Sequence, residues 1–325
     1  MQAIKIKIFE LQLGVIKLVT SVINRLKIVL TTSLSAKLPM GDWLWNWRHS
    51  KDLKLEQLFA TKYQAIIAKY QTAQLTATIP KQPRIWLIWM QGEEAMPYVV
   101  AKSYQAILRY RGNFEVVLLT EENMHEYIEI PVEISRQIDA ETFQIAHLTD
   151  YLRYALLAQY GGVWLDLTMY VNAPIPPLSP AYEFVYNKGL VRFQEDYYFP
   201  NIYDFQITYL AMHKNALLAN FMRDMVYAYL VDGKVYDYFA TYALAMTGFK
   251  HIPALAAQYA AAPQINEQSE RFSNRDERVM LAGLEEDLST FAYKFTSEWW
   301  NEDNFPAMAT KIDAAGEIKA AKTGD

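Results

Sequence analysis

The chain has 325 residues, of which 52% are hydrophobic, so it is long enough for one large α/β unit with an appendage. A net charge of −5 argues against a general nucleic-acid binder. The absence of cysteine excludes disulfides, thiolate catalysis and cysteine zinc sites, and the five histidines lack paired metal-ligand spacing. This composition is typical of a cytoplasmic globular protein.

The first 38 residues have the pattern of a basic amphipathic helix. Glu10 is their one acidic residue, among six basic ones: Lys5, Lys7, Lys17, Arg25, Lys27 and Lys37. The longest uncharged stretch, 28–36, is far shorter than the ~20 residues of a membrane span. The helix is therefore expected either to pack on its own domain or a second subunit, as in a homodimer, or to contact the anionic inner face of the cell membrane. The tryptophans at 43, 45 and 47 fit equally well at a membrane interface or in a hydrophobic contact between parts of the protein.

Strands alternating with helices are predicted after a second helical stretch, 53–75. Two prolines at 80 and 83 mark a break, so we divide the chain into a helical region 1–78, an α/β domain 79–307 and a frayed tail 308–325. Strands are expected at 85–90 and 114–119, and helices at 96–111 and 131–140, which implies a mostly parallel sheet.

The residues that follow the first strand are candidates for binding a ligand. Ligands of open α/β sheets bind beyond the carboxyl ends of strands, which makes Trp89, Met90 and Gln91 candidates for contact with a bound ligand. Trp86, earlier in the same strand, is expected to belong to the core.

The stretch 147–171 is the most informative part of the chain. Apolar residues at helical spacing predict a helix that opens with Asp150 and Arg153, one turn apart on a second face. Gly161 and Gly162 end this helix, because the chain there must enter a left-handed conformation. The alternation in 163–171 predicts one strand on which Asp166 and Thr168 share a face. A buried aspartate among apolar residues needs a cation, an arginine or an opening to solvent.

At these positions the chain resembles the sugar-nucleotide-dependent glycosyltransferases of family 32 and the capsular polysaccharide synthesis group. Their motif of Ser/Thr-Asp-x-x-Arg, a helix, Tyr-Gly-Gly and an apolar strand ending in Asp is matched by Thr149, Asp150, Arg153, Tyr160, Gly161, Gly162 and Asp166. The resemblance extends over roughly 79–300 and weakens after Pro177. It implies a GT-A-like fold and transfer of a sugar, with retention, from a UDP-sugar to a capsular or surface polysaccharide, or to its polyprenyl-linked precursor.

The resemblance also implies roles for individual residues. Asp166 would hold a divalent cation, Mn or Mg. Thr168 stands at the second position of the general Asp-x-Asp form, as a threonine does in part of the capsular group. Asp150 and Arg153 would hold the donor together with Gly161 and Gly162; the alternative for the charged pair is an ion pair at a helix start. Near the end of the domain, Lys294 and Ser297 would approach the diphosphate, with Thr296 and Trp299 as weaker candidates. The alternative is an ordinary strand and helix start.

Further interpretations concern the second half of the domain and the kind of protein. The aromatic and acidic stretch 182–209 is either an acceptor cleft or a chance cluster among 23 tyrosines. The helices predicted at 215–229 and 237–246 are packing layers. Because of Thr168, a catalytically degenerate binding or scaffolding protein is an alternative to the enzyme. A transferase that modifies a protein is a third hypothesis.

Overall fold

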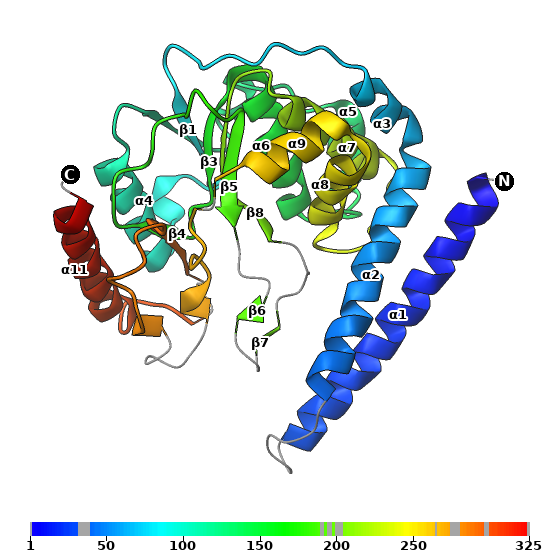
Figure 1. Ribbon diagram of the computed structural model, residues 1–325, viewed down its shortest axis with the longest axis horizontal. Coiled ribbons are helices and arrows are strands. Elements are labelled where there is room, and N and C mark those ends of the chain that lie inside the picture. The colour runs from blue at the N-terminus through cyan, green and yellow to red at the C-terminus, as the bar shows by residue number, and fades with distance from the viewer. Residues whose placement is uncertain are drawn as a thin grey trace.

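The protein is a mixed α/β structure with a five-stranded sheet at its centre (Figure 1). The computed structural model describes residues 2–31, 40–188, 192–193, 197–198, 204–263, 265–273, 280–295 and 299–323. The helices are α1 (Gln2–Thr31), α2 (Met40–Lys62), α3 (Gln64–Gln71), α4 (Tyr98–Tyr110), α5 (Val132–Asp139), α6 (Ile145–Tyr160), α7 (Leu217–Val231), α8 (Ala240–His251), α9 (Pro253–Ala261) and α11 (Phe305–Thr323). The strands are β1 (Arg84–Ile88), β2 (Glu115–Leu119), β3 (Gly162–Leu165), β4 (Met169–Val171), β5 (Phe184–Lys188), β6 (Arg192–Phe193), β7 (Tyr197–Tyr198), β8 (Phe205–Met212) and β9 (Ala292–Lys294).

The sheet has the strand order β2-β1-β3-β8-β5. β1 is parallel to both β2 and β3, whereas β8 is antiparallel to its neighbours β3 and β5. β8 is therefore the one strand of this sheet that runs against the others. The predicted mixed, mostly parallel sheet with flanking helices is confirmed.

Side chains alternate along the central strands and feed two apolar layers. Trp86 and Trp164 point into the layer formed with α2, α3, α6, α7 and α8. Ile85 and Val163, one residue earlier, point into the opposite layer with α4. The side chains that the central strands contribute to both layers are buried. The sheet is therefore covered on both faces, as is usual for sheets rich in parallel strands. Trp86 is a core residue, as expected.

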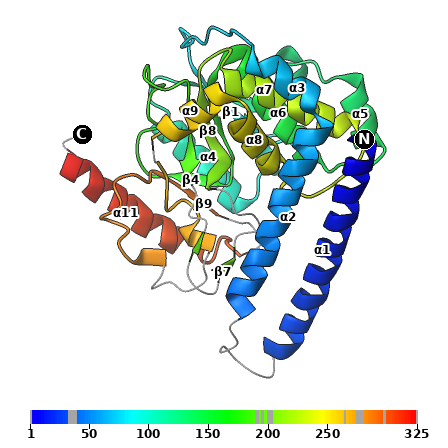
Figure 2. The same ribbon diagram turned by 45° about the vertical axis from the view of Figure 1, so that its right-hand side comes forward.

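The N-terminal helices form an antiparallel pair that extends beyond the body (Figures 1 and 2). Helices were predicted in this region, but the second half of α2 is no appendage: Leu58 and Phe59 are buried in the core layer of the α/β domain. Trp43, Trp45 and Trp47 lie in α2, and their side chains fall outside those described. None of the described helices is both long and apolar enough to cross a bilayer.

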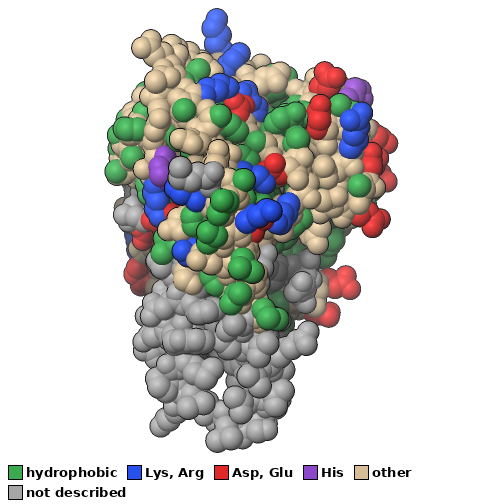
Figure 3. Space-filling model, turned by 90° about the vertical axis from the view of Figure 1, so that its right-hand side faces the viewer, with side chains coloured by type: hydrophobic (Ala, Val, Ile, Leu, Met, Phe, Trp, Pro, Cys, Tyr) green, Lys and Arg blue, Asp and Glu red, His purple; other side chains and the backbone are tan. Residues whose placement is uncertain are grey.

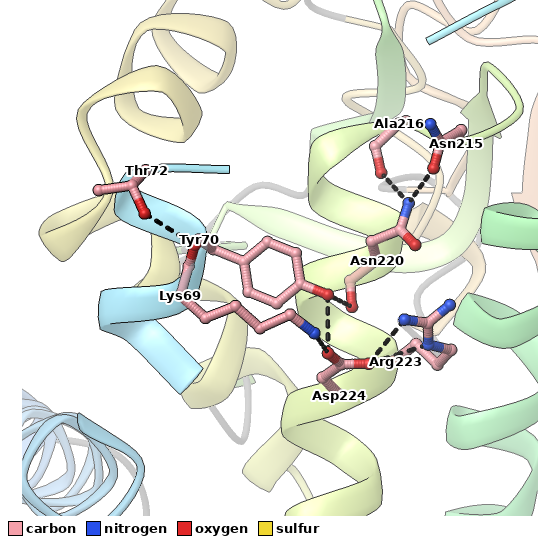
Figure 4. A network of polar contacts seen from close by, with 8 residues as sticks. All are labelled: Lys69, Tyr70, Thr72, Asn215, Ala216, Asn220, Arg223 and Asp224. Atoms are coloured by element: carbon pink, nitrogen blue, oxygen red, sulfur yellow. Dashed lines mark hydrogen bonds and ion pairs between the residues drawn. The ribbon is translucent and has the colours of Figure 1, made fainter. Parts of the chain in front are cut away.

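A polar network attaches α3 to α7 (Figure 4). The Tyr70 hydroxyl lies 3.0 Å from the carbonyl oxygen of Asn220 and 2.7 Å from the Asp224 carboxylate. Lys69 and Arg223 donate to the same carboxylate. Burial by itself would raise the pKa of Asp224, but these donors outweigh it and lower that pKa. The network continues the packing of the N-terminal region onto the domain.

The C-terminal segment differs from the expected frayed tail. Residues 305–323 form α11, whose Met308, Ile312 and Ala315 are buried against Tyr293 and Phe295. Lys319 in this helix is also buried, and its Nζ donates to the Thr290 carbonyl at 2.9 Å and to the Tyr293 hydroxyl at 2.8 Å. The Ala, Lys, Gly and Thr content of this segment suggested fraying. The segment is ordered instead because one narrow apolar stripe of the helix is buried.

Gly161 and Gly162 allow α6 to connect directly to β3. Both have positive φ, +68° and +105°. A Cβ on Gly161 would lie 2.4 Å from the backbone nitrogen of Lys214, and one on Gly162 would lie 2.3 Å from the carbonyl oxygen of Arg84. Conformation and space both require glycine here, as predicted.

The first prediction follows from this tight turn. Gly162→Ala should lower the free energy of unfolding by at least about 2 kcal/mol, because the new methyl group meets β1 backbone at a strained φ. Gly14→Ala is the matched control, since no atom lies within 4 Å of a Cβ added at Gly14 and α1 is helical there. Urea unfolding should show the control unchanged or stabilised by up to about 1 kcal/mol. Equal effects of the two substitutions would refute the steric argument.

A second prediction concerns Lys319. Burial lowers the pKa of Lys319 to about 8 in the folded chain. In the unfolded chain it is about 10.4, so between these values the unfolded state binds more protons and stability rises with pH. From pH 7.5 to 9.5 the wild type should gain about 2 kcal/mol relative to Lys319→Met. Urea unfolding of both proteins at these pH values measures this difference; parallel pH profiles would contradict it.

Candidate functional site

A pocket of about 530 Å³ opens at the carboxyl ends of β1 and β3. We call it the strand-end pocket. It is lined by these sequence-predicted residues: Trp89, Met90, Gln91, Asp150, Arg153, Asp166, Thr168 and Lys294. The wall is completed by Ile88, Ile145, Ala146, His147, Thr149, Leu167, Ile207, Thr208, Tyr238, Phe239 and Tyr242. Its location agrees with the general rule for ligands of open α/β sheets.

Asp166 follows β3 and is held firmly by its neighbours. Its backbone N–H donates to the Thr208 carbonyl on β8 at 2.9 Å. The indole N–H of Trp164 donates to Oδ1 at 2.8 Å, and Nη2 of Arg153 donates to the same oxygen at 3.3 Å. Within the described part of the chain, Oδ2 has no hydrogen-bond partner. The carboxylate is thus oriented through one oxygen while the other remains for a ligand.

Arg153 is buried, with 4% of its surface exposed, between two carboxylates. It donates to Asp150 on its own helix as well as to Asp166, and its guanidinium lies 4.8 Å from the Trp164 ring centroid. Asp150 in turn accepts from the Thr241 hydroxyl on α8 at 2.6 Å. Burial alone would lower the pKa of Arg153, but the charges of Asp150 and Asp166 outweigh it and raise that pKa. Arg153 is therefore a permanent cation that joins α6, the end of β3 and, through Asp150, α8.

The sequence predicted that Asp150 and Arg153 lie at the start of a helix, and this prediction is wrong. α6 begins at Ile145, so Asp150 and Arg153 lie in its second and third turns. The N-cap is Gln144, whose side chain and that of His147 form a reciprocal capping box. The Nδ1 atom of His147 accepts the backbone N–H of Gln144, which is one of the contacts that fix the earlier start of the helix.

Lys294 brings a second cation to the strand-end pocket. It is the last residue of β9, which pairs with β4, and its backbone N–H donates to the Ser269 carbonyl at 2.7 Å. Burial would lower the pKa of Lys294, but the charges of Glu270 and Asp166 outweigh it and raise the pKa. Lys294 therefore stays protonated at neutral pH. Thr296 and Ser297 lie outside the described residues, and Trp299 is 41% exposed and does not line the pocket.

The predicted single strand 163–171 is in fact two strands. β3 ends at Leu165, a turn closed by the Met169 N–H and the Asp166 carbonyl follows, and β4 then pairs with β9 in a separate small sheet. Leu167 is buried within the turn, so the apolar alternation continues although the strand does not. Asp166 and Thr168 both line the pocket because this turn places them there. The prediction that they share one face of a single strand is wrong.

Gly161 and Gly162 are not brought to the strand-end pocket. They lie at the amino end of β3, whereas Asp166 follows its carboxyl end. Their neighbours are the backbone of Lys214 and of Arg84. In the described structure their role is to join α6 to β3, and the expectation that they bind the donor is not supported by their position.

Several residues that line the pocket or hold its charged side chains were not predicted as site residues. Trp164 donates to Asp166 and precedes it by two residues, and this i,i+2 relation is the signal that could have found it. His147 accepts the backbone N–H of Gln144 at Nδ1, and its buried Nε2 has no partner within the described chain. Thr241 and Tyr242 come from α8, and nothing in the local sequence around them indicates the pocket.

A divalent cation in this pocket would have one protein carboxylate. Among the described residues no three histidine or acidic side chains converge on a metal position. The free oxygen of Asp166, with Thr168 beside it in the wall, fits a hard cation whose remaining ligands are phosphate oxygens and water. Such an ion would be held largely by the ligand it accompanies.

Comparisons with known proteins add a family and a distant structural neighbour. No curated protein matches the chain. One solved structure similar to it is described as "PaToxG Glycosyltransferase", with 14% identity, a TM-score of 0.41, and coverage of 84% of this chain and 97% of that one.

The family model described as "Capsular polysaccharide synthesis protein" matches residues 47–309. The match begins in α2, ends in α11 and includes every residue that lines the strand-end pocket. It therefore covers the α/β domain together with the part of α2 that shares its core. By this match the chain belongs to the capsular polysaccharide synthesis protein family.

Proposed function

We propose that the protein is a glycosyltransferase that moves a sugar from a UDP-sugar to a growing capsular or surface polysaccharide or to its polyprenyl-linked precursor. The observation that carries this proposal is the arrangement at Asp166. Among the described residues one of its carboxylate oxygens has no hydrogen-bond partner, and it lies in a pocket that also holds the cations Arg153 and Lys294. Membership of the capsular polysaccharide synthesis protein family supports the polysaccharide pathway.

The size and walls of the strand-end pocket suit a nucleotide-sugar. Its volume of about 530 Å³ falls in the range of roughly 300–1,000 Å³ typical of small-molecule sites. Trp89, Met90 and Gln91 extend from the end of β1 and form the side on which we place the base. The Trp89 indole N–H is buried and has no hydrogen-bond partner in the described chain. Asp150, Arg153 and Asp166 then lie on the side of the sugar and diphosphate.

The chemistry requires charge neutralisation at the leaving group. When the bond between the anomeric carbon and the diphosphate oxygen breaks, the nucleoside diphosphate leaves with an added negative charge, and the acceptor hydroxyl forms the new bond and loses its proton. Lys294 and Arg153 stay protonated and are held in place before the substrate arrives, so they stabilise that charge without reorganisation. Their fixed positions are the physical basis of the proposed catalysis.

A bound Mn or Mg ion would supply further neutralisation of the diphosphate. Asp166 would be its protein ligand, with Thr168 reaching it weakly or through water. Retention of the anomeric configuration is proposed on the resemblance of the 149–166 motif alone.

The second candidate is a binding protein on a degenerate transferase fold. The observation in its favour is the single carboxylate at the metal position, since Thr168 replaces a second acidic residue. The two candidates differ in one measurement. An enzyme releases UDP from the correct UDP-sugar, whereas a binding protein is stabilised by the donor and releases none.

We expect Asp166→Asn to reduce UDP release at least about a hundredfold, because the substitution removes the charge that faces the donor but little volume. Asp313→Asn is the matched control: this aspartate on α11 accepts from Tyr170 and lies outside the pocket. UDP release is measured across a panel of UDP-sugars with Mn, and again with EDTA. Near-normal release by a correctly folded Asp166→Asn protein would remove Asp166 from the mechanism.

Asp150→Asn and Arg153→Lys should each weaken donor binding or turnover by about tenfold or more, roughly 1.4 kcal/mol. Lysine keeps the charge of Arg153 but cannot contact both carboxylates with a planar fork. Arg223→Lys and Asp224→Asn on α7 are the controls, since they alter an ion pair outside the pocket. If calorimetric titration and turnover are equally affected in both pairs, the contribution is to stability rather than to the site.

A further inference from the structure

Helix α1 has apolar side chains on two opposite sides. On the inner side, Leu13 and Ile16 are buried, and Ile6 and Phe9 pack against the core. On the outer side, five large apolar residues are exposed by 49–72%: Ile4, Ile8, Leu11, Val15 and Leu18. We call these five residues the outer stripe.

The outer stripe is continuous. Its residues recur at intervals of four and three along the helix, which places them on one side. Isolated exposed apolar residues need no explanation, but a row along several turns marks an interaction surface. Figure 3 views the side of the molecule on which α1 lies, where hydrophobic side chains and Lys or Arg side chains gather above the grey region.

The charge around the stripe is positive. Lys5 and Lys7 are exposed beside it. Glu10 is the one acidic residue of α1, and it is engaged by the body of the protein: Lys234 lies 2.9 Å away and the Tyr236 hydroxyl donates at 2.7 Å. The bond from Lys234 chiefly lowers the pKa of Glu10, so this carboxylate stays ionised and turned inward. A basic, apolar surface thus stands on a chain whose net charge is −5.

Contacts with the body hold α1 in this orientation. Gln2 donates to the Thr61 carbonyl on α2 at 2.6 Å, and Glu10 is tied to the loop after α7. The outer stripe therefore cannot turn inward without breaking these contacts and unpacking Leu13 and Ile16. Figures 1 and 2 show that α1 runs beside α2, on the side of α2 that faces away from the body of the protein.

We propose that the outer stripe of α1 docks on the surface of an anionic lipid bilayer. Apolar side chains would enter the boundary between headgroups and acyl chains, while Lys5 and Lys7 would contact the anionic headgroups. A second copy of the chain is the less suitable occupant. Two α1 helices paired through their stripes would bring lysines together with no available carboxylate on either helix. The proposal does not depend on the proposed sugar transfer.

The test is co-flotation of the full chain with vesicles of phosphatidylcholine alone or with phosphatidylserine added. We expect at least tenfold stronger partitioning onto the anionic vesicles, weakened by salt. The triple variant Ile8→Gln, Leu11→Gln, Val15→Gln should lose at least tenfold of this binding, and so should Lys5→Glu combined with Lys7→Glu. The matched control is Val132→Gln with Leu288→Gln, whose side chains are 54% and 55% exposed elsewhere on the surface. The control should bind as the wild type does.

Sedimentation velocity without lipid separates the alternative. If the wild type is a dimer that the triple variant turns into a monomer, the stripe is a self-interface and the proposal is overturned. Equal vesicle binding by the triple variant and the control, with helical content unchanged, also overturns it. Asp166→Asn should still bind vesicles, so loss of sugar transfer and loss of membrane docking are separately observable.

Discussion

The buried guanidinium of Arg153 is the interaction on which the site depends. A charge taken out of water is costly unless carboxylates surround it, and here Asp150 and Asp166 do so. Because these carboxylates belong to α6 and to the turn after β3, the pairing sets the position of the helix relative to the end of the sheet. Thr241 extends the same constraint to α8. The pocket can therefore hold its shape before any ligand arrives.

The packing around this centre explains why distant parts of the chain form one body. β3 lies between β1 and β8. Trp86 on β1 and Trp164 on β3 share a layer with α2, α6 and α7. The indole N–H of Trp86 also donates to the Gly161 carbonyl at 2.9 Å, which fastens the tight turn to β1. The small sheet of β4 and β9 brings Lys294 to the pocket from far along the chain. The strand-end pocket is thus assembled from elements that are stabilised independently of it.

Basic side chains gather at two places on a protein that is acidic overall. Acidic residues exceed basic ones overall, yet the cations Arg153 and Lys294 lie in the pocket, and Lys5 and Lys7 lie beside the outer stripe. Both groups of cations suit phosphate-bearing partners, one a nucleotide-sugar and the other a lipid surface. An enzyme with a lipid-linked acceptor would benefit from having both, because docking raises the local concentration of that acceptor.

The sequence by itself determined the local features whose causes are local. Paired glycines predicted the turn after α6, helical spacing joined Asp150 to Arg153, and apolar runs located β1 and β2. It also identified the four charged residues that line the pocket, Asp150, Arg153, Asp166 and Lys294, through their resemblance to family motifs. The family match agrees with the resemblance inferred from those residues.

Only the tertiary structure decided the features that depend on distant contacts. The break between β3 and β4 arises because β4 pairs with β9, whose residues lie more than a hundred positions later. The order of α11 depends on an apolar stripe that is buried against Tyr293 and Phe295. Helix packing brings Tyr242 to the pocket and Thr241 to Asp150. It also leaves one apolar side of α1 exposed because α2 covers the other. Hydrophobic periodicity shows that a side chain should be buried, but its partner is chosen by the three-dimensional packing of the whole chain.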